Sequence, residues 1–330
     1  MPALQLTGFG DPAEVVTLVP QAALVARGDD VVVALEAAPV HPSDINLIRG
    51  IYGVRPPLPA PLGAEGVGKV VEVGPDANEA LLGHRVAILP TYEQGTWAQQ
   101  VLVSSRNAVA VSDEGDPRQL AMIGVNPITA LLLLRLFGSV AKGDWIAQTG
   151  ANSAVGQYVI SLAERAAIHV LNVVRSPEAA TQVGDAGGEH VVIDGDDLPS
   201  QLQRVLGKQE LALVLDSIGG PVVTNLAHRL RYGGKVVSFG ALSGRPTTLD
   251  VRRDLIYRNV SHHGFWTFNW LTRAPRAEID AAYQEIVALV TSGELTADID
   301  STFRLEQYAD ALSRAEQDRR HGKVLFVFGD

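Results

Sequence analysis

The sequence of 330 residues contains no cysteine. This absence excludes disulfide bonds, a thiol nucleophile and a structural zinc bound by cysteine. Eight histidines remain, and none has the i, i+4 spacing of a metal-binding pair on a helix. The neighbours His262 and His263 would point to opposite faces of a strand. We therefore interpret the histidines as structural or surface residues and expect no bound metal.

Long apolar runs and an excess of positive charge are missing as well. An apolar stretch such as residues 130–134 is far too short to span a bilayer. The formal net charge of −10 argues against nucleic acid as a partner. Residues 1–6 resemble a strand more than a signal peptide or an arginine-rich transit segment. With 46% hydrophobic and 19% charged residues, we expect a soluble, cytoplasmic, globular protein without a membrane partner.

The length predicts two domains, and the residue pattern divides accordingly. Up to about residue 111 the chain is rich in turns, with strands expected at residues 31–35, 67–73, 85–89 and 97–103. Residues 51–63 form a proline-dense segment that cannot be helical, and we expect it to be fixed near a site. Helices are expected at residues 116–122 and 127–137.

Beyond residue 144, strands and helices alternate. We expect strands at residues 145–149, 168–174, 190–194, 211–216 and 235–239, separated by helices at 154–167, 177–186, 198–207 and 220–231. Short buried strands that alternate with helices indicate a doubly wound α/β fold with a parallel sheet. A helix at residues 277–292 then leads to a β-like tail, residues 323–328, which we expect to rejoin the first domain.

Residues 150–156, Gly-Ala-Asn-Ser-Ala-Val-Gly, form a small-residue turn between an expected strand and an expected helix. This order can place a pyrophosphate at the helix N-terminus, where free N–H groups and the helix dipole favour anions. The middle glycine of the G-x-G-x-x-G pattern is missing, and the small residues Ser153 and Ala154 stand in that part of the loop. An ordinary strand–helix turn is the alternative, but the context favours nucleotide binding.

The next expected strand ends in Arg175 and Ser176, where a protein that prefers NAD carries an acidic residue for the ribose 2′-hydroxyl. Arg175 can form a forked ion pair with a 2′-phosphate, so we expect NADPH as the cofactor. A solvated arginine at a strand end is the alternative. Glycine turns at residues 216–220 and 232–235 would also permit close approach to a cofactor, although each can be a routine turn.

Five motifs then suggest a family. They are Asn46-Leu47-Ile48-Arg49-Gly50-Ile51-Tyr52-Gly53, Asn126-Pro127, Gly150-Ala151-Asn152-Ser153, Asn172-Val173-Val174-Arg175, and Gly264-Phe265-Trp266 followed by Trp270. Together they resemble the medium-chain dehydrogenase/reductase superfamily over essentially the whole chain, and within it the mitochondrial-type 2-enoyl thioester reductases. Asn-Val-Val-Arg together with Gly-Phe-Trp is far more specific than the glycine loop.

The chain departs from the zinc-dependent members of this superfamily. Their Gly-His-Glu motif reads Gly63-Ala64-Glu65 here, and the segment of their cysteine ligand reads His41-Pro42-Ser43-Asp44. Zinc alcohol-dehydrogenase chemistry is therefore not expected. The targeting segment of organellar members is also missing at the N-terminus, which suits a bacterial or cytoplasmic relative.

The resemblance implies a GroES-like catalytic domain from residues 1–122 and 296–330 and a Rossmann domain from residues 123–295. It implies Tyr52 as the catalytic tyrosine. The alternative is that Tyr52 is a loop aromatic that only packs on the prolines, which is the more common role of a tyrosine. The implied cofactor residues are Asn126, Asn152, Ser153, Ala154, Val155, Arg175, Ser176, Tyr232, Gly233, Gly234, Phe265, Trp266 and Lys323. Trp266 and Trp270 are otherwise ordinary core or interface aromatics.

The implied reaction is conjugate reduction of an α,β-unsaturated thioester, with hydride delivered to the β-carbon and a proton to the α-carbon. Tyr52 could donate a hydrogen bond to the developing enolate or supply the proton. Acyl-carrier protein is a candidate partner, and a homodimer is expected. The sequence leaves two alternatives: an NADPH-dependent quinone or enone reductase on the same scaffold, and a non-catalytic NADPH-binding regulator. The acyl length and the carrier stay open.

Overall fold

The computed structural model describes residues 1–138, 140–317 and 320–329. The chain folds into two compact units, which we call the first unit (Met1–Ile128 with Leu271–Asp330) and the second unit (Thr129–Trp270). The sequence predicts domain boundaries near residues 122 and 296, whereas the compact units divide after Ile128 and after Trp270. The long helix α10 (Arg276–Thr291) groups with the first unit. There the buried Tyr283 hydroxyl donates to the Gly124 carbonyl oxygen at 2.9 Å.

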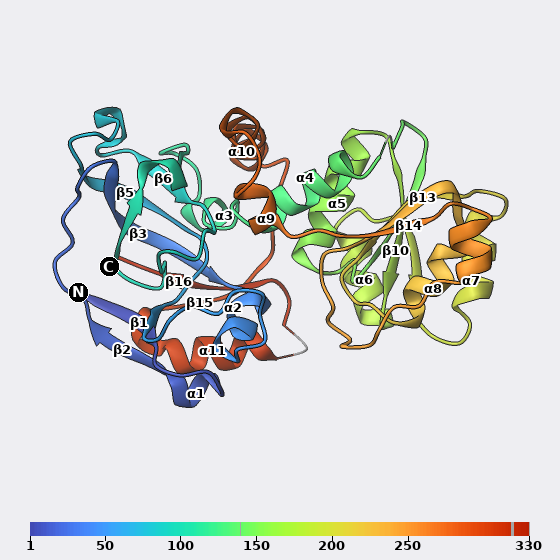
Figure 1. Cartoon of the computed structure of the whole chain (residues 1–330), viewed down its shortest axis with the longest axis horizontal. Helices are drawn as coiled ribbons and strands as arrows, with labels where there is room; N and C mark the ends of the chain where they lie inside the picture. The colour runs from blue at the N-terminus through green and yellow to red at the C-terminus, as the bar shows by residue number, and fades with distance from the viewer. Residues whose placement is uncertain (139, 318–319, 330) are drawn as a thin grey trace. The chain divides into compact units, whose positions relative to one another are not determined.

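The first unit is rich in β-structure, as the sequence predicts (Figure 1). Its elements are β1 (Pro2–Leu6), α1 (Pro12–Val15), β2 (Val16–Pro20), β3 (Asp30–Val40), α2 (Pro42–Ile48), β4 (Ala60–Pro61), β5 (Gly66–Val73), β6 (Arg85–Ile88), β7 (Gln100–Ser104), β8 (Ala108–Ala110), α3 (Pro117–Leu120), α10, β15 (Ile299–Phe303), α11 (Tyr308–Glu316) and β16 (Lys323–Val327). The larger sheet has the order β15-β16-β3-β5-β6-β8, and β7 also pairs with β3. The C-terminal strand β16 lies antiparallel to β3, with Val324 opposite Val40. The tail therefore rejoins the N-terminal sheet, as expected.

The second unit has the expected doubly wound fold. Its elements are β9 (Trp145–Thr149), α5 (Ala154–Arg165), β10 (His169–Val174), α6 (Pro177–Asp185), β11 (His190–Ile193), α7 (Leu198–Leu206), β12 (Leu211–Asp216), α8 (Pro221–Ala227), β13 (Leu230–Ser238), β14 (Ser261–Gly264) and α9 (Thr267–Leu271), and the division between the units falls inside α4 (Asn126–Leu136). The strands are parallel, in the order β11-β10-β9-β12-β13-β14.

Helices cover both faces of this parallel sheet (Figure 1). On one face, Leu202 of α7 and Leu226 of α8 pack in one apolar cluster with Val173 of β10. On the other, α5 and α6 pack against Val174, the next residue of the same strand. Because successive strand residues point to opposite faces, a strand that is buried at every position from 170 to 174 requires cover on both sides.

Strand β14 was not predicted, and its sequence shows why. Ser-His-His-Gly lacks the β-branched residues that mark the other strands, because β14 is the edge of the sheet and three of its residues are exposed. Helix α8 also ends at Ala227, earlier than the expected residue 231, and β13 begins at Leu230.

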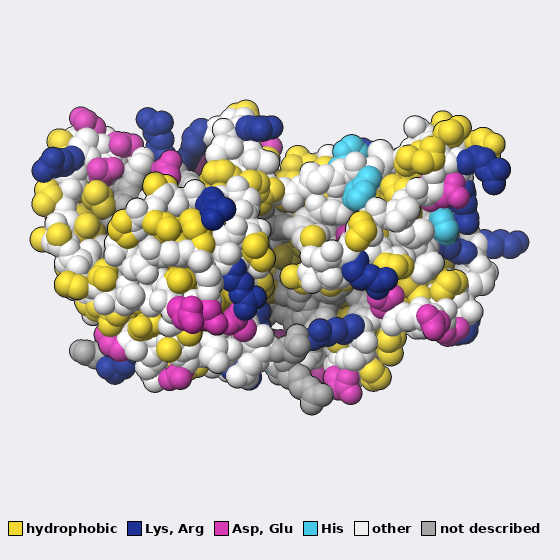
Figure 2. All heavy atoms as spheres, turned by 60° about the horizontal axis from the view of Figure 1, so that its bottom comes forward, with side chains coloured by type: hydrophobic (Ala, Val, Ile, Leu, Met, Phe, Trp, Pro, Cys, Tyr) yellow, Lys and Arg dark blue, Asp and Glu magenta, His cyan; other side chains and the backbone are white. Residues whose placement is uncertain are grey.

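Among the described helices, none combines the length and apolar character needed to cross a bilayer. Figure 2 shows acidic and basic side chains interspersed on the face in view.

Candidate functional site

The carboxyl edge of the parallel sheet carries the glycine loop. Strand β9 ends at Thr149, and Gly150 has φ 62°, a left-handed conformation. A Cβ atom at Gly150 would lie 2.6 Å from Ser217 Oγ, and one at Gly156 would lie 2.3 Å from the Ala151 carbonyl oxygen. Both positions therefore require glycine. The loop delivers the chain into the N-terminus of α5, where the Ser153 hydroxyl accepts a hydrogen bond from Gly156 N at 3.2 Å.

A buried carboxylate holds this edge together. Asp216, at the end of β12, is fully buried. Its Oδ1 accepts hydrogen bonds from Thr149 Oγ1 at 2.7 Å and from the backbone N–H groups of Ile218 and Gly219 at 3.0 Å each. Its Oδ2 accepts from Ser238 Oγ at 3.0 Å. One side chain thus ties together the ends of β9, β12 and β13.

In the sequence, residues 216–220 stand out only as a glycine turn, and no motif marks Asp216, Thr149 or Ser238 as functional. The available signal was an acidic residue closing an apolar strand just before a turn, a position from which a carboxylate can accept from backbone N–H groups two and three residues on.

The expected 2′-phosphate contacts lie at the same edge. Arg175 is exposed directly after β10. The Ser176 hydroxyl accepts from Ala179 N at 3.3 Å and caps α6. Behind them, Gln148 Nε2 donates to Oδ1 of the buried Asn172 at 2.7 Å, which joins β9 to β10.

Two further predicted residues follow β14. Phe265 N donates to the Ser238 carbonyl oxygen at 2.9 Å, and Trp266 packs against Phe268 with ring centroids 5.0 Å apart. The structure therefore brings one predicted group together at the carboxyl edge: Asn152, Ser153, Ala154, Val155, Arg175, Ser176, Phe265 and Trp266. In a parallel sheet, this is the edge at which ligands bind.

Tyr232, Gly233 and Gly234 lie elsewhere. They belong to the first half of β13, before Lys235, which pairs with Leu213 near the start of β12. Tyr232 is exposed there. These residues lie toward the amino edge of the sheet, away from the glycine loop, and we leave them out of the candidate cofactor site. Ser238 and Gly240 occupy the corresponding place at the carboxyl edge, where a Cβ on Gly240 would approach the Ser217 carbonyl oxygen to 2.8 Å.

Tyr52 belongs to the first unit and follows α2. Its hydroxyl lies 2.9 Å from the Tyr92 hydroxyl, and the two ring centroids are 5.7 Å apart. Nearby in the same loop, the Arg55 guanidinium lies 4.5 Å from the centroid of the Phe9 ring. The proline-dense segment thus presents a tyrosine whose hydroxyl has a definite partner.

Four titratable side chains are buried together in the first unit: His41, Asp44, Glu65 and Lys323, which we call the buried polar cluster. His41 Nε2 lies 2.6 Å from Glu65 Oε1, and Lys323 Nζ lies 3.1 Å from His41 Nδ1. Because an ammonium can only donate, Nδ1 accepts and Nε2–H donates to Glu65. Asp44 Oδ2 accepts from His41 N at 2.8 Å.

Burial governs the protonation of this cluster. It raises the pKa of Asp44 to about 7 and the pKa of Glu65 to about 8, and it lowers the pKa of Lys323 to about 8. The pKa of His41 is lowered by burial and by the Lys323 charge. The sequence predicts Lys323 as a cofactor residue, but its ammonium is buried against His41, which argues against that contact.

Asn126 is also buried in the first unit, and among the described residues its Nδ2 has no hydrogen-bond partner. An unsatisfied amide is available to a ligand.

The described residues contain no group of three or more His, Asp or Glu side chains arranged to hold a metal. Ala64, where zinc-dependent relatives carry a ligand histidine, is buried and offers no side-chain donor.

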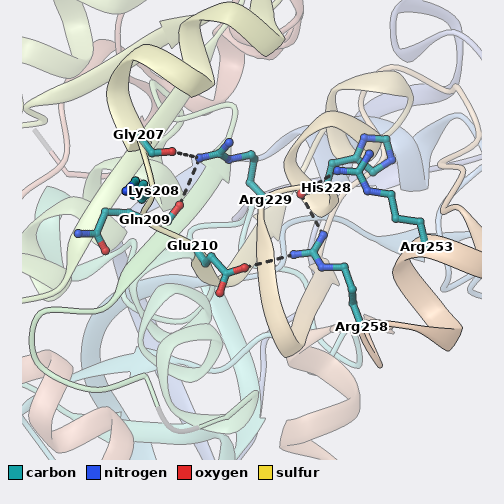
Figure 3. A pocket seen from close by; sticks show the side chains of 8 residues that line it. All are labelled: Gly207, Lys208, Gln209, Glu210, His228, Arg229, Arg253 and Arg258. Atoms are coloured by element: carbon teal, nitrogen blue, oxygen red, sulfur yellow. Dashed lines mark hydrogen bonds and ion pairs between the residues drawn. The ribbon is translucent and has the colours of Figure 1, made fainter.

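A polar pocket of about 380 Å³ in the second unit is not this site (Figure 3). It lies beyond the ends of α7 and α8, toward the amino edge of the sheet. Arg229 Nη2 donates to the Gly207 carbonyl oxygen at 2.7 Å, and Arg258 Nη1 donates to that of His228 at 2.9 Å. These guanidinium groups satisfy helix C-terminal carbonyls, so we assign the pocket a structural role.

Two family descriptions match the chain: the alcohol dehydrogenase GroES-like domain over residues 27–113, and the zinc-binding dehydrogenase over residues 186–325. The mitochondrial enoyl-(acyl-carrier-protein) reductase of Rattus norvegicus is 32% identical over 315 residues, which covers 94% of this chain and 84% of that protein.

Solved structures share the fold. The quinone oxidoreductase of Pseudomonas syringae pv. Tomato superposes with a TM-score of 0.87 at 24% identity over 99% of both chains. The complex of Etr1p with NADP and crotonyl-CoA superposes with a TM-score of 0.84 at 24% identity, again over 99% of both chains.

Proposed function

Because this chain belongs to the family of mitochondrial-type enoyl-(acyl-carrier-protein) reductases within the medium-chain dehydrogenase/reductase superfamily, we propose that it reduces the C2=C3 bond of a trans-2-enoyl thioester with NADPH. The protein is an oxidoreductase that uses a nicotinamide cofactor. One observation supports thioester reduction in particular. Tyr52 lies in the motif of residues 46–53, which resembles that of the enoyl thioester reductases, and its hydroxyl lies 2.9 Å from Tyr92 Oη.

The residues of the carboxyl edge fit a dinucleotide phosphate. Gly150 and Gly156 keep the loop free of Cβ atoms where the backbone turns closely, and the first N–H groups of α5 face the loop. Arg175 would bind the 2′-phosphate, since a guanidinium forms two parallel hydrogen bonds with it. NADP in the related complex supports the choice of the phosphorylated cofactor.

Bound NADPH supplies the hydride for the β-carbon of the substrate. Negative charge then develops on the thioester oxygen, and a preorganised donor lowers the barrier by stabilising it. Tyr52 is the residue for this task, because a phenol is a neutral donor at physiological pH. The same O–H group can deliver the proton that completes the reaction at the α-carbon.

Side-by-side assays of NADPH oxidation with crotonyl-CoA, decenoyl-CoA and a simple quinone test the proposal. We expect turnover of the thioesters, and a loss of roughly 10²–10³ in rate for Tyr52→Phe, which removes one hydroxyl and keeps the ring. NADPH affinity should stay near that of the unmodified protein. A rate on crotonyl-CoA equal to that of the unmodified protein would refute the role of Tyr52.

The second candidate function is quinone reduction, supported by the fold shared with the Pseudomonas quinone oxidoreductase. A quinone accepts hydride without protonation of carbon, so its turnover should depend little on Tyr52. Good quinone turnover with negligible thioester turnover would establish this alternative. Binding of NADPH with no turnover of any substrate would indicate the non-catalytic regulator.

We also propose that two copies associate through β14, the exposed edge strand of the parallel sheet. An edge strand with free backbone groups can extend its sheet by pairing with another strand. Analytical ultracentrifugation should find a dimer, and a monomer at micromolar concentration would contradict this. An acyl-carrier protein as substrate carrier is tested by replacing CoA with the carrier in the assay above.

A further inference from the structure

Tyr92 adopts a backbone conformation that tyrosine rarely occupies. Its φ is 60°, in the left-handed region, which the described non-glycine residues share only with Ala167 and Asn259. Such a conformation is unfavourable for a bulky side chain and persists only where its surroundings impose it.

The surroundings of Tyr92 do impose it. Thr91 N donates to the Leu89 carbonyl oxygen at 2.9 Å, and Thr91 Oγ1 donates to Gln94 Oε1 at 2.8 Å. Gln94 Nε2 donates a hydrogen bond to the same carbonyl oxygen of Leu89 at 3.0 Å. These bonds hold the turn on both sides of Tyr92 and direct its side chain to Tyr52.

The Tyr92 hydroxyl keeps its proton. Burial raises the pKa of Tyr92 far above its usual value, and the nearby Tyr52, Asp44 and Glu65 raise it further. A hydroxyl that does not ionise can serve its neighbour as a donor. When one hydroxyl donates its proton to another, the accepting hydroxyl keeps its own proton available for a hydrogen bond to a third group.

Building on the proposed thioester reduction, we propose that Tyr92 is a positioning residue for Tyr52. The two hydroxyl oxygens lie 2.9 Å apart. In the proposed arrangement Tyr92 is the donor of this pair, which directs the Tyr52 proton toward the thioester oxygen. The strained backbone of Tyr92 is the feature that holds this hydroxyl in place.

The arrangement also serves proton transfer. When Tyr52 protonates the enolate, its O–H bond breaks, a C–H bond forms at the α-carbon, and the negative charge passes to Tyr52 Oη. The hydrogen bond from Tyr92 stabilises that charge. A proton from water then restores the Tyr52 hydroxyl.

The test is a double-mutant cycle with Tyr52→Phe, Tyr92→Phe and the double variant, assayed on crotonyl-CoA. Tyr92→Phe should lower kcat by about 10- to 100-fold, the usual scale for a lost hydrogen bond to a charged group. KM and NADPH affinity should change little. Because Tyr92 acts through Tyr52, adding Tyr92→Phe to Tyr52→Phe should cause no further loss. A merely structural residue would instead lower the rate by the same factor in both backgrounds.

Tyr308→Phe is the matched control, since Tyr308 packs on the apolar core of the same unit. It should leave kcat unchanged. If Tyr92→Phe is too unstable to assay, Tyr92→Asn gives the same comparison, because asparagine tolerates the left-handed conformation. Unchanged kcat in a folded Tyr92 variant, or multiplicative losses in the cycle, would overturn the inference. An unmodified enzyme that does not reduce crotonyl-CoA would instead refute the proposed function.

Discussion

Asp216 at the carboxyl edge of the second unit and the pair Asp44 and Glu65 of the first unit are all buried carboxyls, but their surroundings differ. In the second unit, Asp216 accepts hydrogen bonds from hydroxyls and backbone N–H groups, none of which titrates in the ordinary pH range. In the first unit, Asp44 and Glu65 share a buried space with His41 and Lys323, which do titrate. The second unit thus holds its site with fixed dipoles, whereas the first keeps a cluster whose charge depends on pH.

This difference fits the roles that we propose for the two units. A loop that binds a phosphate needs donors in invariant positions, because displacement of even one strand end would move the α5 N-terminus. The first unit carries Tyr52 and Tyr92, whose proposed roles depend on where their hydroxyl protons lie. The carboxyls of Asp44 and Glu65 lie close enough to Tyr92 to raise its pKa.

The largest effect should come from Asp216→Asn. The amide that replaces the carboxylate keeps one acceptor oxygen for the three donors at Oδ1, but it loses the negative charge and the acceptor of the Ser238 hydroxyl. We therefore expect a loss of about 2–4 kcal/mol in the free energy of unfolding. Urea denaturation measures it, and the exposed Asp196→Asn serves as control. A loss below that of the control would mean that the fixed network contributes nothing to the edge.

Arg175→Ala should weaken cofactor binding and leave the free energy of unfolding unchanged. We expect it to remove about 1.5–3 kcal/mol of the preference for NADPH over NADH, as for one charged hydrogen-bonding group. Fluorescence titrations with both cofactors measure this preference. Lys142→Ala, at an exposed position before β9, removes a charge away from the carboxyl edge and should leave the preference intact. Equal affinities of the unmodified protein for the two cofactors would contradict the assignment of Arg175.

The buried polar cluster should make stability fall with rising pH between about 6.5 and 8. The folded pKa values of Asp44, about 7, and Glu65, about 8, lie above their usual values. The stability tied to their protonated forms is therefore complete below pH 4 and is lost as pH rises through 7 and 8. His41, with its lowered pKa, acts oppositely below pH 6.5, and Lys323 acts oppositely above pH 8.

Over this window we expect a loss of about 1–2 kcal/mol that Glu65→Gln reduces. Thermal unfolding at several pH values measures it, with the exposed Glu14→Gln as control. An equal slope in Glu65→Gln and in the unmodified protein would show that Glu65 does not titrate there.

An ion pair in the first unit should show the opposite pH dependence and the smallest effect. Arg314 Nε and Nη2 donate to the two oxygens of Asp300 at 2.7 and 2.6 Å and lower the pKa of Asp300 to about 2. This stabilisation is present above pH 4 and is lost as pH falls through 2. Arg314→Met should therefore cost about 1 kcal/mol at neutral pH and almost nothing near pH 2. A cost that persists at pH 2 would assign Arg314 to packing instead.

The sequence by itself determined the parts of this protein that depend on local chemistry. Alternating strands and helices predict the doubly wound unit, because short apolar runs separated by amphipathic helices bury their faces in a parallel sheet covered by helices. Gly150 and Gly156 mark the loop to which we assign phosphate binding, since close backbone approach is a local property. The absence of cysteine and the Tyr52 motif likewise need no knowledge of distant contacts.

Only the tertiary structure decided which distant residues meet. Tyr92 lies forty positions from Tyr52, and the buried polar cluster gathers side chains from α2, β16 and the segment before β5. No local pattern encodes such contacts, because they arise from strand register and packing. The same reason explains the glycine pair at 233–234. A glycine turn looks alike at either edge of a sheet, and only the pairing of Lys235 with Leu213 puts it near the amino edge.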